Sequence, residues 1–201
     1  MRIRVVVALA AGLAGLPLAI APAQAFDPAQ TFRQGTTVLS VETGGGSQNN
    51  LERHRVQSNL DLWSIGMRYS LLPLAPTGPS FLRGSLEVGL EPIYQKYGGG
   101  RDAFWAGLSA QGRWHFLSLG RFVPYVELGA GAGGTDLRAI EIDSTFAFLL
   151  SGGVGASFFV TDQLALYGGY RLVHVSNGHI STRNRGFEAD TGLLGVSYFF
   201  K

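Results

Sequence analysis

Apolar and polar residues alternate with a period of two over long stretches of this chain, and this is the period of a β-strand. In the stretch 104–116, for example, Phe104 and Leu108 fall on one face, and Gln111 and Arg113 fall on the other. The same alternation predicts eight strands along the chain, an even number. They cover residues 35–43, 59–71, 82–90, 104–116, 121–131, 146–158, 163–176 and 186–200.

Most of these strands have the length of transmembrane β-strands, which need about 9–11 tilted residues. One face is almost purely Leu, Val, Phe and Ala, with aromatic residues near the strand ends, as on the wall of an outer-membrane barrel. The other face carries small and charged residues, which can fill the narrow interior of an eight-stranded barrel. We therefore predict an all-β fold, an eight-stranded antiparallel transmembrane β-barrel with a polar packed interior. A soluble barrel or sandwich is the alternative. The charged residues of the predicted inner face are Arg68, Arg83, Glu87, Glu91, Arg113, Glu127 and Arg171.

The predicted connections alternate between long and short. Tight turns at 117–120 and 160–162 and a Pro-rich connection at 71–80 lie on the side of both chain ends. In such barrels this side is periplasmic, so the longer connections face outward. They cover residues 44–56, 95–102, 132–143 and 177–185.

The first 25 residues are typical of a cleaved secretory signal peptide. Arg2 and Arg4 form a positive start, an apolar run follows over 5–18, and Ala23–Ala25 reads as an A-x-A cleavage site. Residues 26–201 are then a single outer-membrane barrel domain. Because Arg2 and Arg4 account for the whole formal charge of +2, the basic excess indicates no nucleic-acid partner.

The composition narrows the chemistry. Charged residues make up 15% of the chain and hydrophobic residues 46%, which excludes a disordered chain. Since the chain has no cysteine, it has no disulfide framework, no thiolate metal site and no cysteine nucleophile. We expect neither a metal nor a cofactor.

One predicted strand carries polar residues on its lipid-facing side. In 163–176 the apolar residues occupy every second position, and His174 and Ser176 fall on the same face as these apolar residues. Polar groups that face lipid indicate a functional site. If the hairpin is symmetric about residue 181, Glu188 stands opposite His174, within reach of its imidazole. A serine beside a base that an acid orients is the arrangement of a nucleophilic triad. Asp190 shares the parity of Glu188 and would replace it if the register slipped by two residues.

The segment 173–188 resembles the active-site segment of the PagL-type lipid A 3-O-deacylases, which are eight-stranded outer-membrane esterases. Serine follows histidine by two residues, asparagine follows the serine directly and again eight residues later, and glutamate comes twelve residues after the serine. The resemblance implies a triad and an oxyanion site, and one departure from the family is His179, which stands where the family has glycine. The implied triad is Ser176, His174 and Glu188, and the implied oxyanion residues are Asn177 and Asn184.

The same resemblance implies lipid A of lipopolysaccharide as substrate, with the 3-O-linked acyl chain as the group removed and the site facing the outer leaflet. Membrane lipid is the other expected partner, and a homodimer is left open. His179 is either a solvated loop residue or a further substrate contact. Arginine side chains of the outward loops are candidates for holding the lipid A phosphates. These are Arg53, Arg55, Arg101, Arg138, Arg183 and Arg185.

Two other functions fit the sequence. An esterase of the same design could act on phospholipid esters. From a different class, the chain could be a non-catalytic barrel that serves adhesion or envelope integrity. The side on which His174, Ser176 and Glu188 point separates catalysis from the structural alternative.

Overall fold

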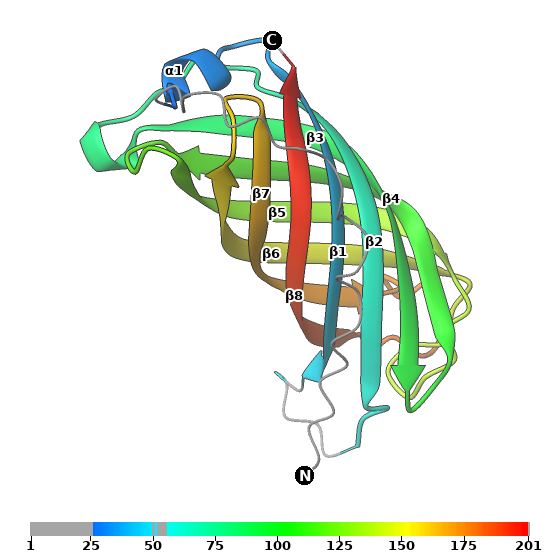
Figure 1. Ribbon diagram of the computed structural model, residues 1–201. Helices are drawn as coiled ribbons and strands as arrows, with labels where there is room; N and C mark the ends of the chain where they lie inside the picture. The colour runs from blue at the N-terminus through cyan, green and yellow to red at the C-terminus, as the bar shows by residue number, and fades with distance from the viewer. Residues whose placement is uncertain (1–25, 50, 52–55, 201) are drawn as a thin grey trace.

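The computed structural model describes residues 26–49, 51 and 56–200, and the predicted signal peptide lies outside them. Eight antiparallel strands form a closed barrel in which each strand pairs with its neighbour in sequence, and the first pairs with the last (Figure 1). The fold class is therefore the predicted one. The strands are β1 (Thr37–Asn49), β2 (Leu60–Leu71), β3 (Gly84–Gly99), β4 (Ala103–Phe116), β5 (Phe122–Thr135), β6 (Phe146–Phe159), β7 (Leu164–Ser176) and β8 (Phe187–Phe200).

Two short helical segments complete the described chain, α1 (Pro28–Thr31) and the 3-10 turn η1 (Ser80–Leu82). Within the described residues, no helix is long and apolar enough to cross a membrane. The helix α1 lies at the end of the barrel where β8 ends (Figure 1), and Thr31 Oγ1 donates to the carbonyl of Asp162 in the β6–β7 turn at 2.8 Å. Phe32 then enters this end of the barrel and is fully buried.

Three strands run further than their alternation predicts, and one of them, β5, ends at Thr135 instead of residue 131. β1 continues through three glycines to Asn49, because β8 pairs with it as far as Glu188. β3 continues to Gly99, so the connection to β4 is short, and the long loop predicted at 95–102 is wrong. In β1 and β5 glycine hides the alternation, and in β3 the buried Ile93 and Tyr97 and the exposed Lys96 reverse it, so the partner strand decides the length.

The barrel interior has three layers. Apolar clusters fill both ends, one around Phe32, Phe159 and Phe199 and the other around Trp105 and Leu149. Between them lies a layer of buried charges, as the inner-face pattern predicts. Arg83 is an exception, because it precedes β3 and is exposed. The charged layer consists of Glu42, Arg68, Glu87, Glu91, Arg113, His115, Glu127 and Arg171.

The outer wall is apolar around the barrel. Its exposed side chains alternate with the buried ones along each strand, as on the lipid-facing surface of a membrane barrel. These two faces set the context of the site, because a charged group on the outer wall departs from the pattern. Large exposed apolar residues include Val41, Met67, Leu90, Leu108, Leu128, Leu150, Leu166 and Leu194.

Candidate active site on the outer wall

The hairpin of β7 and β8 brings His174 and Glu188 together. Val173 and Val175 point inward and are buried, so the residue between them points outward. The strands pair His174 directly with Glu188, and His174 Nδ1 lies 2.8 Å from Glu188 Oε1. The histidine side chain is 34% exposed and the glutamate 15%. The pair is thus partly shielded but open on one side.

Asp190 takes a different position. It pairs across the strands with Leu172, and its carboxylate accepts a hydrogen bond from the Tyr170 hydroxyl. The register therefore has no two-residue slip. Glu188, not Asp190, is the acid beside His174.

Gly186 holds the other edge of the imidazole. Its φ is +73°, in the left-handed region that favours glycine. A Cβ at this position would lie 2.9 Å from His174 Cε1 and 3.3 Å from Nε2. Only a residue without a side chain lets the loop pack this closely, so Gly186 and Glu188 together restrict the ring on two sides.

Ser176 ends β7 on the same face as His174 and lies at an apolar groove of about 590 Å³ on the outer wall. With His174 Nδ1 paired to Glu188, Nε2 is the ring nitrogen left for the serine. Among the described side chains none hydrogen-bonds to Ser176 Oγ, and such contacts commonly tighten only when substrate is bound.

The groove crosses several strands in a row. β7 Ser176 pairs with β6 Phe148, Phe148 with β5 Ala132, and Ala132 with β4 Leu108. The small residues of β5 form the floor, and the larger side chains of β4 and β6 rise on either side. The groove is lined by Leu90, Leu108, Ala110, Ala130, Gly131, Ala132, Phe148, Leu150 and Ser176.

Asn177 is fully buried and fixes the turn that follows Ser176. Its side-chain amide donates to Ser181 Oγ at 2.6 Å and to the carbonyl of Arg183 at 3.0 Å. Its side-chain oxygen accepts from the backbone of His179 at 3.0 Å, and its own backbone N–H donates to Asn184 Oδ1 at 2.6 Å. Every polar group of the Asn177 side chain is therefore engaged inside the loop.

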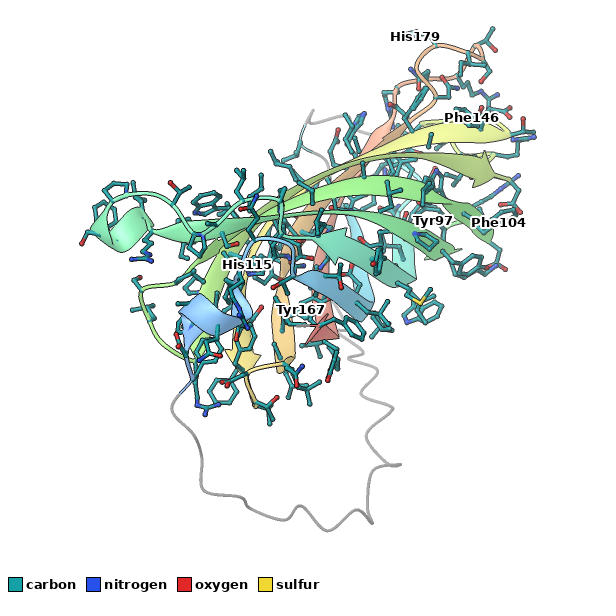
Figure 2. The ribbon with its side chains drawn as sticks, turned by 90° about the horizontal axis from the view of Figure 1, so that it is seen from above. Tyr97, Phe104, His115, Phe146, Tyr167 and His179 are labelled. Carbon is teal, nitrogen blue, oxygen red and sulfur yellow. The ribbon has the colours of Figure 1, made fainter. Side chains whose placement is uncertain are left out.

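Gly178 and His179 both have left-handed backbone, with φ of +60° and +65°. Such a conformation is costly for a residue with a Cβ, so His179 adopts here the geometry that a glycine takes freely. The His179 ring is exposed, and its Nδ1 lies 3.3 Å from Asn184 Nδ2. Figure 2 shows His179 on the loop at the end of the barrel away from α1, near Phe146 at the start of β6. Within the described loop no acceptor hydrogen-bonds to the backbone N–H of Gly178.

The structure describes four of the six candidate phosphate-binding arginines. Arg53 and Arg55 lie outside the described residues. Arg138 pairs with Asp143 at 3.0 Å, and Arg185 reaches a buried carboxylate in another loop. Arg101 and Arg183 are exposed.

Across the described part of the chain, no group of three or more His, Asp or Glu residues could hold a metal ion.

The sequence alone does not indicate the residues that support this hairpin. Glu141 and Asp143 of the β5–β6 loop accept hydrogen bonds from Arg185 and Ser181 of the hairpin loop, about 40 residues further along the chain. No local pattern could reveal such contacts.

These features define a class, a transmembrane β-barrel with an acid–base pair and a serine on its lipid-facing wall. A family model described as lipid A 3-O-deacylase (PagL) matches residues 63–197, well over half of the chain. The chain therefore belongs to the lipid A 3-O-deacylase family, whose members are hydrolases, and it is a β-barrel of the bacterial outer membrane.

Solved structures agree with this fold. The outer membrane enzyme PagL is similar with a TM-score of 0.62 and 16% identity, and the match covers 78% of this chain and 97% of that one. Neisserial surface protein A is similar with a TM-score of 0.55 and 14% identity, over 83% of this chain and 100% of that one. A search of the curated proteins returned no match.

Proposed function

We propose that this protein removes the 3-O-linked acyl chain from lipid A through a Ser-His-Glu triad. Membership of the deacylase family supports the substrate. The observation that carries the mechanism is the pair of His174 and Glu188 at 2.8 Å, on the same wall as Ser176 and its groove.

In the proposed reaction, Ser176 Oγ attacks the carbonyl carbon of the ester while its proton passes to His174 Nε2. Glu188 accepts the hydrogen bond from Nδ1–H, which selects the tautomer with a free Nε2 and stabilises the imidazolium that forms. The tetrahedral intermediate then expels the 3-hydroxyl of the glucosamine, which takes the proton from the imidazolium. Water then attacks the acyl-serine and gives a proton to His174 Nε2. Ser176 Oγ takes this proton back as it leaves, and the fatty acid is released.

The oxyanion of this intermediate needs donors near Ser176. The backbone N–H of Gly178 and the side-chain amide of Asn184 are the proposed ones, and Asn177 holds both in place through its contacts within the turn. The loss of one such donor typically costs about 10²–10³ in rate.

The position of the groove favours a substrate with long acyl chains. A chain lying along Ala132 and Phe148 would place its carbonyl at Ser176 without leaving the hydrocarbon layer. Lipid A carries its acyl chains in this layer of the outer leaflet, so the protein takes its substrate from the side.

The test uses protein refolded in detergent. Lipopolysaccharide is incubated with the wild type, with Ser176→Ala and with Ser118→Ala, an exposed serine in the β4–β5 turn. Mass spectrometry of lipid A should show loss of one hydroxyacyl chain with the wild type and Ser118→Ala, and intact lipid A with Ser176→Ala. Intact lipid A with all three proteins overturns the proposal. The same three proteins are also incubated with phospholipid micelles. Release of fatty acid from phospholipid, with lipid A left intact, would identify the alternative phospholipid esterase.

A further inference from the structure

Glu141 lies in the β5–β6 loop, and its carboxylate is the contact point of three outward loops. The side chain is buried, at 1% exposure, although it lies outside the strands. Oε1 accepts from Gln48 Nε2 at 2.8 Å, from the Ser58 backbone at 2.8 Å and from Arg185 Nη2 at 3.2 Å. Oε2 accepts from Ser58 Oγ at 2.7 Å. One carboxylate thus joins the end of β1, the β1–β2 loop and the β7–β8 loop.

The backbone of Glu141 extends this connection towards the candidate triad. Its carbonyl accepts from the N–H groups of Arg185 and Gly186, at 2.8 and 3.1 Å. Gly186 lies against the imidazole edge of His174, and Glu188 follows two residues later. The loop that positions both neighbours of the histidine is therefore bound to Glu141 by its backbone and by the Arg185 side chain.

The charge state of Glu141 fits this role. Burial raises the pKa of the carboxyl group, but the hydrogen bonds from Ser58 and Gln48 outweigh it, so the pKa is lower than the ordinary 4.5. The group is ionised at neutral pH, and a buried carboxylate that lost these donors would be strongly destabilised. The three loops are therefore held together.

We infer that Glu141 is a positioning residue for the triad. It fixes the β7–β8 loop so that Gly186 and Glu188 hold the His174 ring with Nε2 towards Ser176. The inference rests on the proposed function for its kinetic test. The claim that Glu141 fixes the orientation of the His174 imidazole can be tested without substrate.

The kinetic test compares Glu141→Ala, Glu141→Gln and Asp136→Ala. Glutamine can still accept from the Ser58 backbone through one oxygen and donate to Ser58 Oγ through its amide. Asp136 is the matched control, a carboxylate of the same loop that accepts from the Phe104 backbone at 2.7 Å, away from the hairpin.

Since Glu141 does not line the groove, its loss should act on the reacting geometry and not on binding. We expect kcat to fall about 10–100-fold in Glu141→Ala, the cost of a small misplacement of catalytic groups, with KM within about twofold. Glutamine should restore kcat to within about fivefold of the wild type, and Asp136→Ala should match the wild type. Rates are expressed per folded protein, measured by heat-dependent gel mobility. An Ala variant at position 141 that matches Asp136→Ala, or that loses rate only in proportion to its folded fraction, overturns the inference.

A second measurement needs no activity. The Nδ1–H of His174, hydrogen-bonded to Glu188, is followed by NMR of ¹⁵N-histidine-labelled protein in detergent and assigned by its loss in His174→Asn. Glu141→Ala should shift or broaden this resonance, and Asp136→Ala should not. An unchanged resonance in Glu141→Ala overturns the inference even if the wild type is an active deacylase. A changed resonance in a protein that hydrolyses no ester supports the positioning role and refutes the proposed function alone.

Discussion

Arg171 and His174 lie three residues apart on β7 and face opposite sides of the barrel wall. Arg171 points inward and bonds two carboxylates, Glu42 Oε1 at 2.6 Å and Glu127 Oε1 at 2.8 Å. His174 points outward, bonds only Glu188 among the described carboxylates, and keeps a third of its surface open. Both positions follow from the parity of a single strand.

The two sites differ in how accessible their polar groups are. The inner residues form a network of ion pairs that is buried inside the barrel, where Glu91 and Arg68 Nη2 also lack hydrogen-bond partners among the described residues. The outer pair has one partner each and an adjoining groove. Polar groups on a lipid-facing wall are costly, and an accessible acid–base pair on the same wall as a serine has the arrangement that activates a nucleophile. The inner network is therefore placed to support the fold, and the outer pair is placed for the proposed chemistry.

Replacing the serine gives the sharpest separation of the two regions. Ser176→Ala should lower the deacylation rate by at least about 10⁴-fold, because the nucleophile is lost and water must react unaided. The folded fraction and the thermal unfolding midpoint should equal those of the wild type. Residual deacylation above about 1% would refute the role of Ser176.

Removal of the charge at Glu188 comes next in size. Glu188→Gln should lower kcat about 10³–10⁴-fold, because an amide selects the wrong imidazole tautomer and does not stabilise its cation. Asp190→Asn, a lipid-facing carboxylate two residues further along β8, is the control and should stay within about threefold. Equal losses in the two variants would show that the outer wall needs negative charge in general.

The inner network should respond in the opposite way. Arg171→Leu leaves Glu42 and Glu127 buried without their shared partner, and breaking such a pair costs about 3–5 kcal/mol. The unfolding free energy in denaturant should fall by this amount, while kcat per folded molecule stays unchanged. A large fall in kcat without loss of stability would contradict the division between the two regions.

The groove should affect substrate choice more than rate. Ala132→Trp fills the floor two strands from Ser176 and should reduce kcat/KM for long-chain esters about tenfold, with short-chain esters unaffected. Ala156→Trp, an outward residue of β6 that does not line the groove, is the control. Equal effects on long and short chains would indicate that the acyl chain lies elsewhere.

The smallest expected effect is the pH response of the Glu141 contact. Because its pKa in the folded protein is lowered, the carboxylate stabilises the loops fully above about pH 4.5 and loses this contribution as the pH falls through the folded value. Hydrogen-exchange protection of the Ser58 amide, which donates to Glu141, should therefore be higher at pH 6 than at pH 3. In Glu141→Gln the two protection factors should be equal, and a wild type without pH dependence would refute the assignment.

Alternation in the sequence was sufficient to predict the barrel, the facing of nearly all strand residues and the opposition of His174 and Glu188. It underestimated β1 and β5, where glycines carry no polarity signal, and β3, where apolar and polar residues exchange faces, so that these lengths depend on the partner strands. Strand parity and the resemblance to a known family pointed to the same candidate triad. The pattern did not reveal that Asn177 has its side chain engaged within the loop.

The sequence by itself determined which residues face lipid and which face the interior, since a strand leaves each side chain only two directions. It also determined that Ser176 and His174 share a face. The tertiary structure alone decided the groove beside Ser176, which is built from β3 to β7, and the Glu141 contacts between loops about 40 to 90 residues apart. Such contacts depend on barrel closure, which brings distant loops to one rim and gives a buried carboxylate its donors.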